Sequence, residues 1–195
     1  MFNKVSSISK MLEKFYKSCN YNKFIVKYNF YMNSEISDDV KNYLRILNTN
    51  FLFLIDQNKA FAEYEKISLP TDNKYLQAFY FLEIVYLTRK GDYTEARSKL
   101  NNYKKHNSLS KEDCSSLDVY INIYSDKDVE DIEKIFTLTN KIKYQNVFSA
   151  KLLMDYYISK DSKKALEYAK IIKSYKTDFT ETNYFAEEIV LAHSK

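Results

Sequence analysis

The chain has 195 residues, of which 45% are hydrophobic and 29% are charged, and its formal net charge is +4. This composition argues against intrinsic disorder, and the length is sufficient for one domain with a buried core or for one short solenoid. The chain has one glycine (Gly91) and one proline (Pro70), which argues against sheet and nucleotide-binding folds that need glycine for turns and close backbone approach. An all-α fold is therefore expected.

Amphipathic segments that alternate with short polar turns predict pairs of helices along the chain. The predicted pairs are residues 5–18 with 22–32, 38–54 with 59–67, 74–89 with 94–105, 111–124 with 129–142, and 146–159 with 162–174, followed by a last helix over 182–192. The expected N-caps are Ser37, Thr71, Ser110 and Asp178. Ser110 and Asp178 each have an acidic residue three positions later, as in a capping box.

The polar turns recur at a regular spacing. Four of them align, and the aligned segments end in Phe24, Ala60, Ala96 and Ala165. The first two steps are 36 residues long and the last is 69, so a fifth member is expected near Ile132. We call these five positions the anchor column. They predict a helical repeat protein with about five helix pairs.

The periodicity extends to both sides of the anchor column. Nine residues before the anchors lie Phe15, Phe51, Leu87, Ile123 and Tyr156. Four residues after them lie Tyr28, Tyr64, Leu100, Phe136 and Ala169. Large apolar or aromatic residues at fixed helical offsets are expected when one stripe of each helix faces a core.

Two of the turns carry a family resemblance. The segment from Gly91 to Ala96 is similar to the turn into the second helix of a tetratricopeptide (TPR) repeat, and residues 20–23 give a second match. The chain resembles this family over residues 5–176. The resemblance implies a single TPR-like α-solenoid domain over residues 1–195, with about five helix-turn-helix repeats and a C-terminal capping helix. The small residue that the family has in the first helix of each repeat is replaced here by larger residues.

The resemblance also implies a binding surface on one side of each first helix, along the inner face of the superhelix. The candidate partner-binding residues are Tyr16, Arg45, Thr49, Phe81, Val85, Thr88, Ile121, Tyr124, Met154 and Tyr157. This face is apolar and contains tyrosines toward the C-terminal half, which suits an apolar peptide or a helix bound in a groove. The alternative is that a short solenoid simply buries these residues, under the last helix for example.

A lysine-rich section over residues 141–176 supports a second interpretation. Its candidate anion-binding residues are Lys160, Lys163, Lys164, Lys170 and Lys173, with Tyr168 and Tyr175 nearby as stacking groups. Nucleic acid or another polyanion is the alternative partner on this basis. Lysine-rich helix faces are also common as plain solvated surfaces.

The sequence carries no recognisable motif for catalysis or metal binding. The sequence has no HExxH motif, no cluster of cysteine and histidine, no glycine-rich phosphate loop and no nucleophile signature. The expected function is therefore a non-catalytic protein- or peptide-binding module without a metal or cofactor. Two cysteines fit a reducing compartment, and no secretory signal or membrane-spanning stretch is recognised, so a cytoplasmic location is expected.

The last helix is predicted to cap the exposed apolar end of the repeat stack. Phe185, Ile189 and Ala192 form the predicted apolar stripe, joined by Ala186 and Val190. The stripe is expected to pack against the second helix of the fifth pair. The competing interpretation is a helix that fills the inner groove and leaves it when a ligand binds.

Overall fold

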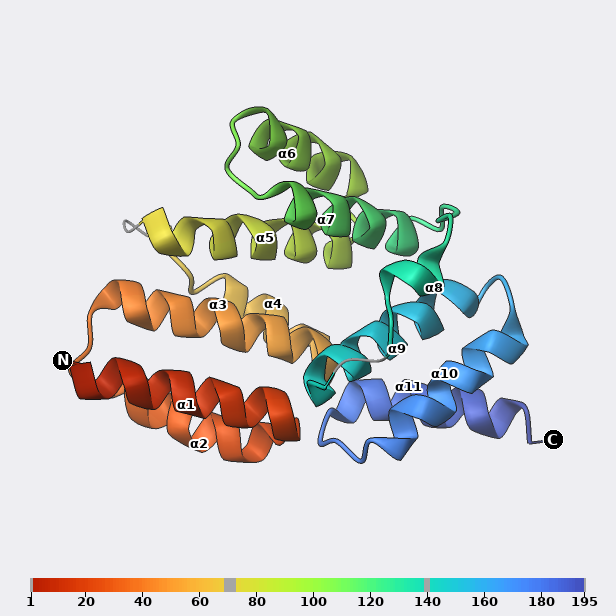
Figure 1. The fold of residues 1–195 in the computed structure, drawn as a ribbon, viewed down its shortest axis with the longest axis horizontal. Coiled ribbons are helices and arrows are strands. Elements are labelled where there is room, and N and C mark those ends of the chain that lie inside the picture. The colour runs from red at the N-terminus through yellow and green to blue at the C-terminus, as the bar shows by residue number, and fades with distance from the viewer. Residues whose placement is uncertain (1, 69–72, 139–140, 195) are drawn as a thin grey trace. The chain divides into compact units, whose positions relative to one another are not determined.

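The computed structural model describes residues 2–68, 73–138 and 141–194, with side chains from residues 6–68, 75–138 and 141–194. Within these ranges the protein is all-α, with eleven helices and no strand (Figure 1). The helices are α1 (Phe2–Ser18), α2 (Tyr21–Met32), α3 (Asp38–Ile55), α4 (Gln57–Tyr64), α5 (Asn73–Lys90), α6 (Tyr93–Lys105), α7 (Lys111–Tyr124), α8 (Ile132–Ile135), α9 (Lys143–Tyr157), α10 (Ser162–Ser174) and α11 (Thr180–Ala192). None of these helices is both long and apolar enough to cross a membrane.

Local capping explains several helix starts. Ser110 caps α7 as predicted: its hydroxyl accepts the backbone N–H of Asp113 at 3.0 Å and donates to the Asp113 carboxylate at 2.7 Å. At the start of α3, the Ser37 hydroxyl accepts the backbone N–H of Val40 at a longer 3.4 Å. Two further caps, Asn20 on α2 and Asp161 on α10, satisfy N–H groups that have no partner inside their helices. The predicted cap Thr71 lies outside the described residues.

The prediction that Asp178 caps the last helix is wrong. The N-cap position of α11 is occupied by Phe179, which makes no side-chain cap. The Asp178 carboxylate instead accepts the backbone N–H groups of Tyr21 and Asn22 at 2.7 and 2.8 Å. A carboxylate at this position also matches the positive end of the α2 dipole. Asp178 therefore links the loop before α11 to the first turn of α2.

The predicted helix over residues 129–142 is also wrong. Among the described residues of this stretch, only the single turn of α8 forms, and it starts after Asp131, whose φ of 52° lies in the left-handed region. Phe136, Thr137 and Leu138, which follow it, are not helical. Threonine is a poor helix former, so it does not favour extension of an isolated turn. Ile132, the predicted anchor, is nevertheless only 3% exposed.

The chain divides into two compact units. Unit 1 comprises residues 1–35, 54–56 and 131–195, and unit 2 comprises residues 36–53 and 57–130. Unit 1 holds α1, α2, the last residues of α3 and α8 to α11. Unit 2 holds the remainder of α3 and α4 to α7. The prediction of one domain over residues 1–195 stays a prediction.

The core of unit 1 forms around Phe15, which is 2% exposed. Its ring lies 5.1 Å from that of Phe24, 5.7 Å from that of Tyr144 and 6.1 Å from that of Phe179. Helix α1 thus packs against α2 and also against α9, which belongs to the fifth predicted pair. Repeats of an extended solenoid contact only their neighbours. The structure does not confirm the predicted solenoid.

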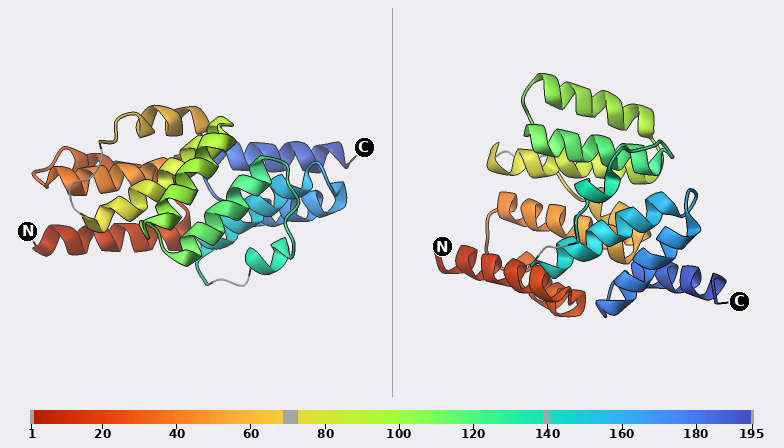
Figure 2. Two further views of the ribbon diagram at one scale, coloured as in Figure 1. Left: turned by 90° about the horizontal axis from the view of Figure 1, so that it is seen from above. Right: turned by 45° about the vertical axis from the view of Figure 1, so that its right-hand side comes forward.

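In unit 2, α5, α6 and α7 pack against one another, as the right-hand view of Figure 2 shows. The turn between α5 and α6 passes through Gly91 at a φ of 91°, a conformation that glycine adopts without strain. Aromatic rings connect the helices that precede this group. Phe61 of α4 contacts Phe53 of α3 and Tyr86 of α5 at 5.7 and 5.5 Å. Many of the aromatic residues are therefore core filler.

The predicted helix phase agrees with the observed burial. All five residues of the anchor column are buried, with exposed fractions of 3% or less. All five residues nine positions before the anchors are buried as well, and so are three of the five residues four positions after them. The 36-residue periodicity therefore identifies the buried face of the helices. This includes α8, whose length was predicted wrongly.

The last helix packs where it was expected but is rotated. In unit 1, Ala186 and Ile189 of α11 join Ala169 and Ile172 of α10 and two residues of α9 in one buried cluster. Figure 1 shows α9, α10 and α11 side by side. Phe185 is 40% exposed and Ala192 is exposed, so neither lies at the centre of the buried stripe, which Thr182 (0% exposed) occupies instead.

A substitution at Ala96 tests the packing of α6. Ala96 is 0% exposed in unit 2, whereas Ser98, two positions later, is exposed. Replacing Ala96 with leucine should overpack the core and lower the free energy of unfolding by roughly 1–3 kcal/mol. Ser98→Leu, which adds a leucine to the same helix, should change stability little. Chemical denaturation of both variants measures the difference, and equal effects would contradict the assigned helix phase.

Candidate functional site

Half of the predicted partner-binding residues are buried. The exposed fraction is 0% for Thr49, Ile121 and Met154, 1% for Thr88 and 6% for Val85. A partner cannot touch these side chains in this conformation. They lie on the predicted face of the helices, but in this structure that face contributes to the core. The burial of these residues is the alternative that the sequence left open.

The other five are half-buried, and four of them contact neighbouring side chains. Within unit 2, Arg45 donates to the Asn42 side chain at 3.3 Å, and the Tyr124 hydroxyl accepts from Arg89 at 2.5 Å. In unit 1, Tyr16 contacts Tyr144 edge-on at 5.3 Å between ring centroids. Tyr157, also in unit 1, belongs to a polar cluster described below. The fifth residue, Phe81, lines a pocket.

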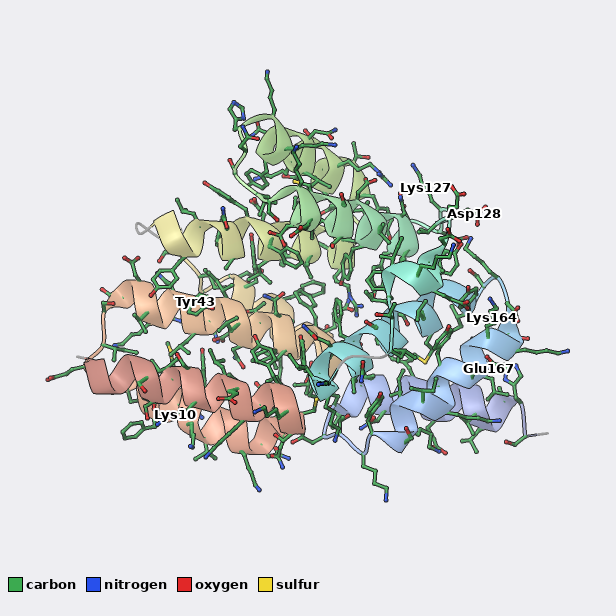
Figure 3. The ribbon with its side chains drawn as sticks, in the orientation of Figure 1. Lys10, Tyr43, Lys127, Asp128, Lys164 and Glu167 are labelled. Atoms are coloured by element: carbon green, nitrogen blue, oxygen red, sulfur yellow. The ribbon has the colours of Figure 1, made fainter. Side chains whose placement is uncertain are left out.

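This pocket lies in unit 2 between α3 and α5, and we call it the α3–α5 pocket. It is an open hollow of about 340 Å³, lined by Tyr43, Ile46, Leu47, Asn50, Gln77, Ala78, Phe81 and Asp113. Tyr43 is labelled on α3 in Figure 3. Polar and apolar atoms contribute about equally to the lining, and the polar groups are the Tyr43 hydroxyl, two amides and one carboxylate. Pockets that combine apolar side chains with a few polar groups are typical of ligand sites.

The polar groups of the α3–α5 pocket have defined roles. The Asn50 amide donates to the Ile46 carbonyl at 3.2 Å, which orients its oxygen as an acceptor. Gln77 is exposed, so its amide can both donate and accept. The Asp113 carboxylate accepts from the Ser110 hydroxyl. Of these lining residues, sequence reasoning identified only Phe81, because Asn50 and Gln77 lie outside the assumed inner-face positions.

A polar cluster in unit 1 surrounds Glu133. Its carboxylate accepts from the Lys164 ammonium at 2.8 Å and from the hydroxyls of Tyr157 and Tyr168 at 3.1 Å each. The bond from Lys164 holds the pKa of Glu133 below its usual range, and the same bond raises the pKa of Lys164. The cluster anchors the short helix α8 to α9 and α10. This gives Tyr157 and Lys164 a structural role.

The predicted anion-binding lysines are only partly available. Besides Lys164, which is labelled on α10 in Figure 3, Lys173 pairs with Glu187, and the Lys160 ammonium lies 5.3 Å from the centre of the Tyr156 ring. Lys163 and Lys170 are exposed. The predicted stacking residue Tyr168 already stacks on Tyr157, and burial raises its pKa to about 12.

Metal ligands do not converge in the part of the chain that the structure describes, where no group of three or more histidine, cysteine, aspartate or glutamate side chains could hold an ion. Cys19 and Cys114 are both buried and free. Comparison of the chain with known protein families, with curated proteins and with solved structures finds no match. The function therefore has to be inferred from the geometry of the sites themselves.

Two buried threonines in unit 2 differ in whether the side-chain hydroxyl makes a hydrogen bond. The Thr88 hydroxyl donates to the Ile84 carbonyl at 2.7 Å, whereas the buried Thr49 hydroxyl has no hydrogen-bond partner among the described residues. Thr49→Val should raise the free energy of unfolding by about 1 kcal/mol, because it removes an unsatisfied polar group at nearly constant volume. Thr88→Val should lower it by about 0.5–1.5 kcal/mol. Urea denaturation gives both values, and a loss of stability in Thr49→Val would contradict the assignment.

Proposed function

We propose that the chain is a non-catalytic peptide- or protein-binding module built from TPR-like helix pairs, and that the α3–α5 pocket is its binding site. The observation that supports this proposal most directly is the pocket itself, which offers apolar side chains beside amide groups on rigid helices. The burial of the 36-residue columns supports the TPR-like interpretation of the pairs.

The lining suggests the kind of peptide that binds. An apolar side chain of the partner fits against Leu47, Ala78 and Phe81. The amides of Asn50 and Gln77 can hydrogen-bond to the peptide backbone, which presents one donor and one acceptor per residue. The Asp113 carboxylate at the pocket favours a basic residue over an acidic one beside the apolar anchor. We therefore expect a short segment with one large apolar residue and a basic neighbour.

A displayed peptide library tests this proposal. The purified chain should enrich peptides with an apolar–basic pair, and Phe81→Ala or Gln77→Ala should weaken their binding at least tenfold, or about 1.4 kcal/mol. Ile158→Ala removes a highly exposed apolar side chain at the end of α9 and serves as the matched control, which should bind as the unmodified chain does. No enriched sequence, or equal binding by all variants, would contradict the proposal.

Polyanion binding is the second candidate, supported by the exposed Lys163 and Lys170 of α10. Because three of the five predicted lysines already contact other side chains, this surface offers few phosphate contacts. A fluorescent single-stranded oligonucleotide measures it: binding should be detectable at low salt, weaken steeply as salt rises, and be reduced in Lys163→Glu/Lys170→Glu. Binding that is absent at low salt, or independent of salt, would exclude this function.

A further inference from the structure

Two helix faces of unit 1 expose large apolar side chains to solvent. On α2, Val26 is 69% and Phe30 is 67% exposed, and on α11, Tyr184, Leu191 and Phe185 are 60%, 55% and 40% exposed. Isolated exposed apolar residues are common, but clustered ones often mark interaction surfaces. A helix that closes a stack of repeats is expected to have a polar outer side. The outer side of α11 departs from this expectation.

The exposed face of α2 is apolar and basic. Lys23, Val26, Lys27 and Phe30 follow the spacing i, i+3, i+4 and i+7, which places all four on one side of the helix, and all four are exposed. Lys23 and Lys27, together with Lys14 of α1, also line a pocket of about 290 Å³ between α1 and α2. The apolar lining of this pocket consists of Met11, Phe15 and Phe24. We call this surface the α2 face.

The exposed face of α11 is apolar and acidic. Tyr184, Glu188 and Leu191 follow the spacing i, i+4 and i+7, so they share one side of the helix, with Phe185 next to them. The Tyr184 hydroxyl donates to the Glu188 carboxylate at 2.7 Å, which holds both side chains on this side. Glu181, one turn before Tyr184, adds a second negative charge and is half-buried. We call this surface the α11 face.

We infer that the α2 face of one molecule binds the α11 face of a second copy of the same chain. The two faces are complementary in charge, with lysines (Lys23 and Lys27) on one and glutamates (Glu188 and Glu181) on the other, and each face offers at least one aromatic and one aliphatic side chain. Packing Tyr184 and Leu191 against Val26 and Phe30 removes exposed apolar surface from both molecules. Each face favours a partner surface of opposite charge, and each molecule carries one basic face and one acidic face.

The contact is heterologous, because the two contacting faces differ. Each molecule keeps one unused face after the first contact, so association continues head to tail into rings or open chains. One helix face per partner is smaller than a standard interface, so the association should be reversible and depend on concentration. Charge pairing at its edge should make it weaker at high salt. This inference concerns a different surface from the α3–α5 pocket and goes beyond peptide binding.

Single-face variants test the inference by light scattering coupled to size-exclusion chromatography over a concentration series. The unmodified chain should form species larger than a dimer as its concentration rises. Phe30→Asp and Leu191→Asp each remove one face and should each be monomeric. An equimolar mixture of the two should form a one-to-one heterodimer and nothing larger, because each variant retains the face that the other has lost.

Charge-reversal variants provide the second measurement and do not depend on apolar substitutions. Lys23→Glu/Lys27→Glu and Glu181→Lys/Glu188→Lys should each be monomeric alone and should associate when mixed. Thermal melts establish that each variant folds. An unmodified chain that stays monomeric at all concentrations overturns the inference and leaves both faces to other proteins. Association that persists in the variants, or that mixing fails to restore, overturns it as well.

Discussion

Deleting residues 180–195 should strongly lower the melting temperature and cause aggregation. The deletion removes α11 and exposes Ala169 and Ile172, two residues of the buried cluster in unit 1. It also removes the hydroxyls of Thr180 and Thr182, which donate to the carbonyls of Ile55 and Leu54 at 2.8 and 2.6 Å. The newly exposed apolar surface has no other element to cover it, which favours aggregation.

Circular dichroism melts and static light scattering measure both effects. Ala192→Ser is the matched control, because it changes an exposed position of the same helix and should leave the melting temperature nearly unchanged. A truncated chain that is soluble, equally stable and binds peptide more tightly would instead favour the interpretation of α11 as a releasable plug. The packing of α11 on α10 supports the cap.

Replacing Phe15 with alanine should cost about 3–5 kcal/mol of unfolding free energy, the range for an aromatic residue removed from a core. Phe15 is 2% exposed and contacts rings from three other parts of the chain, namely α2, α9 and the residue before α11. A loss of this size is a large fraction of the stability of a typical domain, so unit 1 should unfold at a much lower denaturant concentration.

The control is Lys10→Ala, at an exposed position of the same helix that is labelled in Figure 3. Surface substitutions of this kind change stability by about 0.5 kcal/mol or less. Urea denaturation followed by tyrosine fluorescence gives both values. Similar destabilisation by the two substitutions would show that Phe15 does not hold the parts of unit 1 together.

Helix positions could be predicted because their signals are local. The start of α7 at Lys111 follows directly from the capping box at Ser110, and the turn before α6 follows from Gly91. The periodic spacing of apolar residues identified the core side of each helix for the same reason. Asp131 shows the limit: the amphipathic pattern around it favoured a long helix, but its left-handed backbone delays the helix start and Thr137 disfavours its extension.

Features that join distant segments could not be predicted. Asp178 has the local signature of an N-cap, but its partners, Tyr21 and Asn22, lie more than 150 residues away. The candidate site shows the same limit. Helical phase placed Phe81 and Val85 on one side of α5, but it gave no depth, so only Phe81 reaches the pocket. Asn50 and Gln77 carry no motif and become visible only when α3 and α5 are placed together.

The discontinuity of unit 1 has a consequence for biosynthesis. Helices α1 and α2 are synthesised before α9 and α11, yet two of the rings that cover Phe15 belong to Tyr144 and Phe179, which are added much later. Most of unit 2 comes from the stretch between them, so it can fold while the chain is still growing. During translation the apolar side of the α1–α2 hairpin therefore stays exposed until the later helices are made. A nascent chain stalled before residue 179 should present that side to chaperones, whereas a chain extended beyond α11 can complete the core.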